Sequence, residues 1–220
     1  MSSGRADGSR TVEFPISESF VLKILLGDIT EWSVDGSTDA IVNPANEGML
    51  GGGGADGAIH RAAGPELFKA CYALPEVSPG IRCPTGEARI TRGFRLPASH
   101  VIYTVGPIYG IDKNPQATLR NAYRNSLRIA KENGIQYIAF TAISCGVYGY
   151  PYDEAATVAI STVKDFTKDI KESTGRSVSK FWGYLIGNTS SSSIKEVHFV
   201  LYSDEIYDVW LNKANELLQK

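Results

Sequence analysis

Two patterns of apolar and polar residues alternate along most of the chain, and each predicts a different kind of element. Continuous apolar runs, or strict alternation of apolar and polar residues, predict buried or half-buried strands. Apolar residues three or four apart, or small helix-tolerant residues, predict helices. The strand patterns lie at 20–26, 40–42, 86–93, 100–106, 137–144 and 196–202, and the helix patterns lie at 56–63, 65–74, 116–134, 151–170 and 203–219.

Local signals mark the ends of several predicted helices. Pro65 fits the first position of a helix, and Asp153 and Glu154 fall in a first turn, where the helix dipole favours acidic side chains. Gly134 is a good stop signal. Strands that alternate with helices form a largely parallel or mixed sheet with helices on both faces. The sequence therefore predicts an α/β domain with a mixed, mostly parallel central sheet.

Two segments depart from this alternation. We expect residues 1–15 to be a disordered lead-in to a single domain that spans residues 16–220. Residues 173–193 are rich in Ser and Gly at both ends and apolar in the middle, which indicates an insertion between the long helix and the last strand. The insertion is either a packed hairpin or flap, or an exposed contact patch.

Charge and cysteine content narrow the class of protein. The formal net charge is −2, which gives no sign of a nucleic-acid or membrane-surface partner. No apolar run approaches the roughly 20 residues of a membrane span. The three cysteines, Cys71, Cys83 and Cys145, are odd in number and lack metal-ligand spacing. We therefore expect no membrane contact, no direct nucleic-acid binding, no metal site, reduced thiols, and a cytoplasmic or nuclear location.

Three loops of small residues follow predicted strands, at 27–30 (GDIT), 43–57 (NPANEGMLGGGGADG) and 144–150 (SCGVYGY). Ligands of open α/β sheets bind in such loops, beyond the carboxyl ends of the strands. The second loop contains a formal GxGxxG, but about eight residues separate it from its strand. In a dinucleotide-binding fold the glycine turn follows the strand directly, so we reject that interpretation.

The glycine run at 51–54 leads into a predicted helix. Such a loop offers unobstructed backbone N–H groups to an anion. Ordering four glycines is entropically costly, which favours close approach of the backbone to a ligand over a flexible turn. The loop at 144–150 also precedes a helix. The two loops could close on a diphosphate from both sides, with Tyr148 and Tyr150 against a ribose or base.

The polar residues beside the glycine run each allow two roles. Asn43 and Asn46 suit a sugar hydroxyl or an oriented water, but turn formation, which Asn-Pro alone would explain, is an alternative role for both. Asp56 would repel a phosphate, so it faces either a neutral polyol or water, or it is a first-turn partner of the helix dipole. The residues alone leave both possibilities open.

Cys145 allows a rival interpretation as a nucleophile with His60 or His100 as its base. A helix N-terminus can lower a thiol pKa, but no sequence feature places a His beside this cysteine. We interpret Cys145 as a small buried residue and His60 as a core residue of a short apolar helix.

Taken in order, the stretches GDIT, DAIVNPAN, GGGGADGAIHRAAGP, TGEARITRGFRLPASHVIYTVGP and ISCGVYGYP resemble the macrodomain family, and closely its MacroD-type branch. The resemblance covers roughly residues 20–218. It implies a three-layer α/β/α sandwich that binds ADP-ribose and removes it from acidic side chains of proteins. It also implies deacetylation of O-acetyl-ADP-ribose. ADP-ribose is then ligand or product, and no cofactor is needed.

The resemblance also implies roles for individual residues. Asp28 should accept a hydrogen bond from the adenine amino group, and the backbone of Ile29 should support the same ring. Asn46 should contact the distal ribose, and Asp56 should approach that ribose or the attacking water; these two are the candidate catalytic residues. The diphosphate should be held by Gly51, Gly52, Gly53, Gly54, Ser144, Cys145, Gly146, Val147 and Tyr148, with Tyr150 near the adenosine end.

The chain departs from the usual pattern of this branch in its binding loops. NPAN replaces NAAN, SCG replaces STG, and Thr141 stands where a Pro is usual. These changes leave turnover open, so two alternatives stand beside the hydrolase: a non-catalytic ADP-ribose reader and an ADP-ribose phosphate phosphatase. We expect a monomer whose partners are ADP-ribose and ADP-ribosylated proteins.

Overall fold

The computed structural model describes residues 10–175 and 194–219 of the chain. Its sheet has seven strands in the order β1-β2-β7-β6-β3-β5-β4. The neighbours from β2 to β5 run parallel, whereas β1 and β4 pair antiparallel at the two edges. The strands are β1 Thr11–Ser17, β2 Phe20–Leu26, β3 Asp39–Pro44, β4 Ala88–Arg92, β5 His100–Thr104, β6 Tyr137–Phe140 and β7 Glu196–Leu201.

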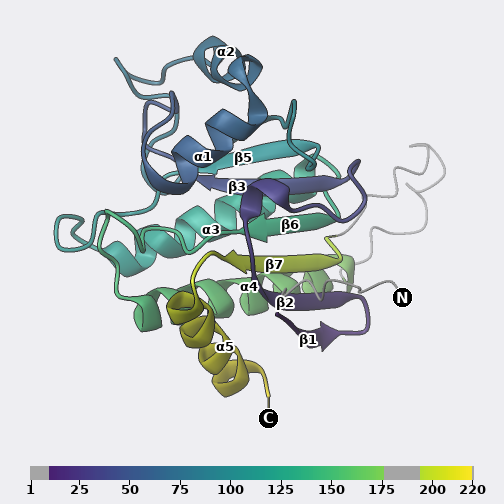
Figure 1. Cartoon of the computed structure of the whole chain (residues 1–220). Helices are drawn as coiled ribbons and strands as arrows, with labels where there is room; N and C mark the ends of the chain where they lie inside the picture. The colour runs from purple at the N-terminus through teal and green to yellow at the C-terminus, as the bar shows by residue number, and fades with distance from the viewer. Residues whose placement is uncertain (1–9, 176–193, 220) are drawn as a thin grey trace, which may run out of the picture.

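Helices cover both faces of this sheet (Figure 1). One face carries the short 3₁₀ helix η1 (Ile29–Glu31), α1 (Gly54–Ala63) and α2 (Pro65–Ala73). The other carries α3 (Pro115–Glu132), α4 (Tyr152–Gly175) and α5 (Asp204–Leu218). The predicted three-layer α/β/α sandwich with a mixed, mostly parallel sheet is therefore confirmed.

The strands divide their side chains between two cores, one on each face. Ala40 and Val42 of β3 belong to the core under α3, α4 and α5, whereas Ile41 between them belongs to the core under α1 and α2. This division follows from the two-residue period of a strand. Asn43, the next odd position of β3, therefore faces α1. The register of β3 thus decides which of its side chains can reach the loop and helix that follow it.

The first strand corrects one expectation about the N-terminal segment. We expected a disordered lead-in up to about residue 15, but Thr11–Ser17 form β1 and pair with β2. Val12, Phe14 and Ile16 point to one core and alternate with polar or proline positions, which is the period-two pattern of a half-buried strand. The expected insertion at 173–193 lies outside the described residues, apart from its first three, which end α4.

The parallel strands end together at one edge of the sheet, at the left in Figure 1. The loops after β2, β3, β5 and β6 all start at this edge. The three loops singled out from the sequence, at 27–30, 43–57 and 144–150, therefore meet where open α/β sheets bind their ligands.

Candidate ligand-binding and catalytic site

A buried pair of side chains joins the end of β3 to the start of α1. The Asn43 amide Nδ2 donates to Asp56 Oδ1 over 2.8 Å. Asn43 is fully buried and Asp56 is 4% exposed. The position of Asn43 on β3 directs its amide nitrogen to Asp56, and direct contact of Asn43 with a ligand stays a prediction. Asn43 fixes the orientation of the carboxylate.

The surroundings of Asp56 change its acidity. Burial raises the pKa of the Asp56 carboxyl, while the hydrogen bond from Asn43 and the nearby His60 act in the opposite direction. His60 Nε2 lies 3.5 Å from Asp56 Oδ1, one helical turn further along α1. The carboxyl group is thus held in an environment that makes it a better proton acceptor than an exposed aspartate.

His60 is a residue of this site that the sequence interpretation missed, because we took it for a core residue. Its Nε2 has no hydrogen-bond partner within the described residues, and the same holds for Asn43 Oδ1. The spacing of four residues from Asp56 was the available signal, because side chains at i and i+4 of a helix are neighbours. The structure brings Asn43, Asp56 and His60 together.

The glycine run covers the Asp56 carboxylate closely. A Cβ on Gly52 would lie 2.9 Å from Asp56 Oδ2 and 3.3 Å from Asn46 Nδ2. A Cβ on Gly57 would lie 2.4 Å from the Gly52 carbonyl oxygen. These two positions therefore need glycine, because any side chain would push the loop away from α1. By contrast, a Cβ on Gly53 would meet nothing within 4 Å.

The backbone of the run is available to a ligand. Within the described residues, the N–H groups of Gly51, Gly52 and Gly53 donate to no backbone carbonyl. Gly52, Gly53 and Gly54 are exposed. The first N–H groups of a helix likewise have no partner inside the helix, so the run and the start of α1 form a continuous set of donors beside Asp56.

Asn46 shapes the same loop. Its Oδ1 accepts from the backbone N–H of Gly48 over 3.1 Å and of Met49 over 3.2 Å. Its Nδ2 donates to the Gly51 carbonyl over 3.0 Å. Asn46 thus forms a turn, one of the two roles that the sequence allowed, and it holds the first glycine of the run. Its amide nitrogen lies next to Gly52, within reach of the space above Asp56.

The second loop, after β6, closes on itself by backbone bonds. Tyr150 N–H donates to the Ser144 carbonyl and Gly149 N–H to the Gly146 carbonyl, each over 2.9 Å. Gly146 and Val147 lie at its exposed tip, where Val147 is 99% exposed. Their N–H groups donate to no backbone carbonyl in the part of the chain described. This tip therefore offers anion-binding donors, while the half-buried Tyr148 lies beside it.

Ser144 and Cys145 lie below this tip. Ser144 is buried with a positive φ of 66°, and a Cβ on Gly106 would lie 2.1 Å from its Oγ. The Cys145 N–H already donates to the Ala142 carbonyl over 3.2 Å. Burial raises the pKa of the Cys145 thiol to about 12. A thiol of this kind is protonated at neutral pH, which argues against a cysteine nucleophile.

Tyr150 packs beneath a second tyrosine. Its side chain is 3% exposed, and its ring centroid lies 4.8 Å from that of Tyr109. Tyr109 follows β5, is 38% exposed, and its backbone N–H donates to the Tyr148 carbonyl over 2.8 Å. The exposed aromatic ring next to the second loop is therefore Tyr109, which the sequence interpretation missed.

The GDIT stretch forms the remaining corner of the site. Asp28 is exposed and caps η1, because its Oδ1 accepts from Thr30 N–H over 2.9 Å and from Thr30 Oγ1 over 2.8 Å. Ile29 is buried, at 6% exposed. Asp28 thus presents a carboxylate at the surface on a short rigid turn directly after β2.

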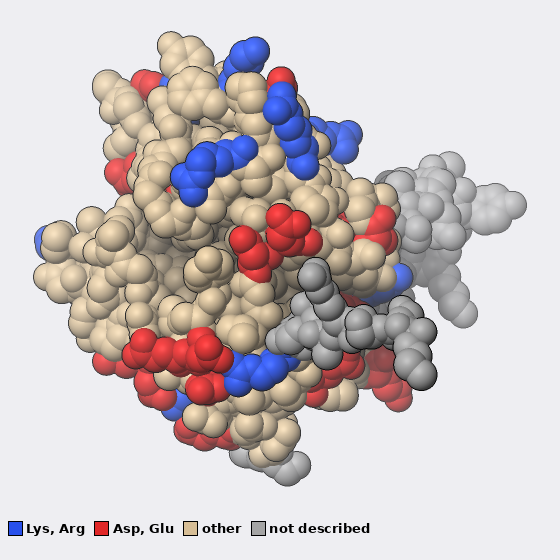
Figure 2. All heavy atoms as spheres, in the orientation of Figure 1, with Lys and Arg blue, Asp and Glu red and all other residues tan. Residues whose placement is uncertain are grey.

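Charged side chains are unevenly distributed over this face (Figure 2). Lys and Arg side chains gather at the top, over α1 and α2, whereas the area at the left, over the loops of the carboxyl edge, is mostly uncharged. A phosphate at that edge would therefore depend on backbone N–H groups and helix N-termini more than on cationic side chains.

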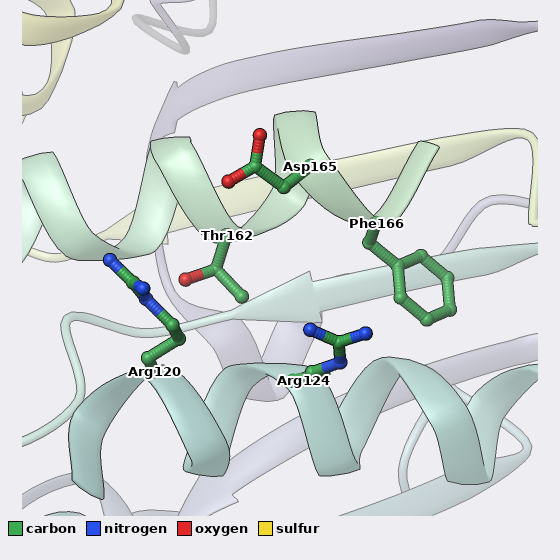
Figure 3. Close-up of a pocket in the computed structure, with 5 residues that line it drawn as sticks. All are labelled: Arg120, Arg124, Thr162, Asp165 and Phe166. Carbon is green, nitrogen blue, oxygen red and sulfur yellow. The ribbon is translucent and has the colours of Figure 1, made fainter. Parts of the chain in front are cut away.

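A separate small pocket lies between α3 and α4 (Figure 3). Since these helices cover the face of the sheet opposite α1, the pocket does not belong to the Asp56 site. Its lining residues are Arg120, Arg124, Thr162, Asp165 and Phe166.

Other features of the described residues bear on the class of chemistry. Cys71, Cys83 and Cys145 are buried and form no disulfide. Within residues 10–175 and 194–219, no group of His, Cys, Asp and Glu side chains has the arrangement of a metal site. None of the helices in these ranges is both long enough and apolar enough to cross a bilayer.

The fold is a three-layer α/β/α sandwich, and its carboxyl edge combines a glycine run, a buried aspartate and a second loop of exposed N–H groups. This combination is typical of a class of domains that bind nucleotides. The family model for the Macro domain matches residues 42–159. The chain therefore belongs to the macrodomain family, as the resemblance predicted.

Relatives and solved structures agree with this assignment. A macro domain-containing protein of Xanthomonas campestris is 53% identical over 151 residues, which are 68% of this chain and 82% of the relative. An O-acetyl-ADP-ribose deacetylase of Citrobacter rodentium is 44% identical over 185 residues, 84% of this chain and 89% of the relative. The structure of an Oceanobacillus iheyensis macrodomain with ADP superposes with a TM-score of 0.80 at 37% identity, covering 97% of this chain and 99% of that one.

Proposed function

We propose that the chain binds ADP-ribose at the carboxyl edge of its sheet and hydrolyses the ester that joins ADP-ribose to an acidic side chain of a modified protein. O-acetyl-ADP-ribose, which carries a similar ester, is a second substrate. Family membership and the relative named as an O-acetyl-ADP-ribose deacetylase support this proposal. The observation that carries it is the Asp56 carboxylate, oriented by Asn43 over 2.8 Å and covered by Gly52.

The ligand would extend along the edge from η1 to α1. Asp28 accepts a hydrogen bond from the adenine amino group, and the Ile29 backbone supports the ring. The diphosphate lies between the glycine run and the tip of the second loop, where backbone N–H groups have no carbonyl partner among the described residues. The distal ribose then lies near Asn46 and Asp56. The superposable Oceanobacillus iheyensis macrodomain was solved with ADP, which supports an adenosine diphosphate as the core of the ligand.

Hydrolysis needs one oriented water. As a carboxylate, Asp56 accepts a hydrogen bond from this water and aligns it with the ester carbonyl or with the anomeric carbon of the ribose. Attack forms one bond to the water oxygen and breaks the acyl–oxygen or the ribose–oxygen bond, so ADP-ribose and a free carboxylic acid leave. Orientation can supply up to roughly 7–11 kcal/mol, and a general base adds on the order of 10²–10⁴-fold.

The raised pKa of Asp56 fits this role, because a base is most effective when its pKa approaches the working pH. Asn43 keeps the carboxylate oriented, and His60, 3.5 Å away, adds a second polar group behind it. A phosphate oxygen of the ligand assists by holding the same water, which makes the reaction partly substrate-assisted.

The test is release of labelled ADP-ribose from a protein modified on Glu or Asp side chains. We expect release by the wild-type chain, a large loss in Asp56→Asn, and no release from a serine-linked ADP-ribose, which is an O-glycoside with a poorer leaving group than a carboxylate ester. The same chain should release acetate from O-acetyl-ADP-ribose. Absence of release from any ester, or equal release by Asp56→Asn, would contradict the proposal.

The burial of Asp56 favours a second candidate function, a reader that binds ADP-ribose without turnover. Asp56 is 4% exposed and Gly52 lies directly over it, so a small shift of the loop could keep water out. Calorimetric binding of ADP-ribose with no turnover of either ester would decide for the reader. Phosphate release from ADP-ribose phosphate, measured in parallel, would decide for the phosphatase.

A further inference from the structure

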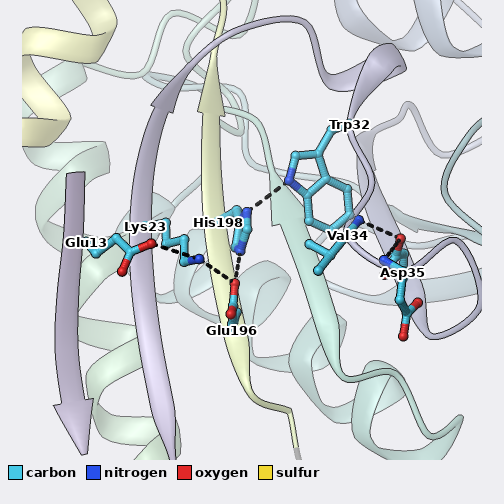
Figure 4. Close-up of polar contacts among 8 residues, drawn as sticks. Glu13, Lys23, Trp32, Val34, Asp35, Glu196 and His198 are labelled. Carbon is cyan, nitrogen blue, oxygen red and sulfur yellow. Dashed lines mark hydrogen bonds and ion pairs between the residues drawn. The ribbon is translucent and has the colours of Figure 1, made fainter. Parts of the chain in front are cut away.

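A row of polar side chains crosses the sheet beneath η1 (Figure 4). Glu13 of β1, Lys23 of β2 and His198 of β7 stand at matched register positions. Lys23 Nζ lies 2.9 Å from Glu13 and 2.9 Å from Glu196. Glu196 in turn lies 2.7 Å from His198 Nε2. The row therefore anchors one ring nitrogen of His198 to the framework of the sheet.

The other ring nitrogen of His198 holds a tryptophan. Trp32 Nε1 donates to His198 Nδ1 over 2.9 Å. Indole is a donor only, so Nδ1 carries no proton and Nε2–H donates to Glu196. Both rings are buried, at 8% and 4% exposed, and they meet edge to face at 5.1 Å. Burial lowers the pKa of His198, which keeps the ring neutral in the tautomer that this bond needs.

Trp32 directly follows η1, the turn that carries Asp28 and Ile29. The Trp32 N–H donates to the Ile29 carbonyl over 3.4 Å and closes the turn. At the other end, Gly27 N–H donates to the Leu201 carbonyl of β7 over 2.9 Å. The turn is thus tied to β7 at both ends, by a backbone bond before it and by the Trp32–His198 bond after it.

The chain beyond Trp32 is also fixed. Asp39, fully buried at the start of β3, accepts from the N–H groups of Val34 over 2.8 Å and of Gly36 over 2.7 Å. Trp32 therefore lies between an anchored turn and an anchored loop. Within this short segment, the bond to His198 sets the position of the indole ring.

We propose that Trp32 and His198 are positioning residues for recognition of the adenine amino group. The pair fixes η1 and with it the direction of the Asp28 carboxylate, so it sets the preference for a 6-aminopurine over a 6-oxopurine. This inference rests on the proposed function, because it takes Asp28 to be the group that faces adenine. Neither residue contacts the ligand.

The experiment compares the affinities for ADP-ribose and for its hypoxanthine analogue, in which an oxygen replaces the amino group. The ratio of the two affinities is measured by calorimetry for the wild type, Trp32→Phe, His198→Leu and His198→Gln. Trp210→Phe is the matched control. Trp210 is fully buried, but it lies in the core under α5 and its Nε1 has no partner within the described residues.

We expect the preference for ADP-ribose over the hypoxanthine analogue to fall about tenfold in Trp32→Phe and in His198→Leu. This is the order of the effect on affinity of one hydrogen bond to a charged group. His198→Gln should retain the ratio, because its amide accepts from the indole and donates to Glu196. Trp210→Phe should lower the melting temperature without changing the ratio. If the affinity ratio of Trp32→Phe equals that of the wild type, this inference is wrong and the proposed function is unaffected. If the wild-type chain binds neither compound, both this inference and the proposed function are wrong.

Discussion

The two faces of the sheet bury polar side chains in different ways. On the face under α3, α4 and α5, buried hydroxyls bond to backbone groups, either of their own helix or of a neighbouring element. Ser126 Oγ donates to the Ala122 carbonyl over 2.8 Å, and Thr162 Oγ1 donates to the Val158 carbonyl over 2.6 Å. Thr104 Oγ1 of β5 donates to the Ala122 carbonyl of α3 over 3.3 Å. Such bonds to the backbone satisfy each hydroxyl without orienting a second side chain, so this face serves as a packed core.

On the face under η1, α1 and α2, buried polar side chains bond to one another across elements. Asn43 joins β3 to α1 through Asp56, and Trp32 joins η1 to β7 through His198. Each bond fixes the direction of a group at the carboxyl edge. The comparison indicates that substitutions under α3 to α5 should cost stability, whereas polar substitutions under η1 and α1 should cost binding or turnover. The predictions below test this division.

The largest expected effect is that of Asp56→Asn on turnover. The amide keeps the size of the carboxylate but cannot accept a proton, so ester hydrolysis should fall by about 10²–10⁴-fold, while ADP-ribose affinity should change by only a few-fold. Single-turnover release measures the first and calorimetry the second. Glu66→Gln is the control, since Glu66 is also a first-turn acid, but it belongs to α2 and pairs with Arg95.

On the opposite face, Leu127→Ala should destabilise the fold without altering the site. Leu127 is fully buried in the core under α3, and truncating such a leucine costs about 2–5 kcal/mol because a cavity remains. Urea unfolding measures the loss. Turnover per folded molecule should equal that of the wild type, and a tenfold fall in turnover would break the proposed division between the faces.

Gly52→Ala and Gly53→Ala form a matched pair within the glycine run. A Cβ on Gly52 would lie 2.9 Å from Asp56 Oδ2, whereas one on Gly53 would meet nothing within 4 Å of the protein. We expect Gly52→Ala to displace the carboxylate and to lower turnover by about 10²-fold, the order of effect of a 1 Å misplacement. Gly53→Ala should have the smaller effect. Equal losses would show that the contact with Asp56 does not matter.

The pH dependence of stability tests the burial of Asp56. Burial raises its pKa above the ordinary value of 3.8, so the folded state favours the protonated carboxyl. The stabilising contribution of that proton is present below pH 3.8 and is lost as pH rises through the folded pKa. Relative to Asp56→Asn, the wild type should therefore be more stable in acid than at neutral pH. Turnover should change with pH in the opposite direction and increase as pH rises, because it needs the ionised carboxylate of Asp56.

The smallest expected effect is that of Cys145→Ser. The thiol is buried and its pKa is raised to about 12, and its Sγ donates to the Ile143 carbonyl over 3.5 Å. Serine can donate to the same oxygen, so turnover should stay within about twofold of the wild type. Loss of all ester hydrolysis in this variant would revive the cysteine nucleophile.

The sequence predicts the architecture of this protein well because that architecture depends on local patterns. Apolar runs, helix stops and the two small-residue loops predict the strands, the helices and the edge at which the loops meet. The strand β1 was missed because its polar and proline positions resemble the lead-in before it, although Val12, Phe14 and Ile16 alternate with them.

The parts of the site that the sequence did not predict are contacts between distant positions. The bond between Trp32 and His198 joins residues 166 positions apart, and no local pattern marks it. The role of Asn43 also depends on register, since only the direction of β3 decides whether its amide reaches a ligand or Asp56. The packing of Tyr109 on Tyr150 depends in the same way on how two loops meet.

The measurement that tests the account most directly is a crystal structure of the protein with ADP-ribose. We predict the diphosphate between the N–H groups of the glycine run and of the second loop, the distal ribose over Gly52, and a water bound to the Asp56 carboxylate within reach of the anomeric carbon. A ligand bound elsewhere, or a distal ribose with no water between it and Asp56, would contradict the account.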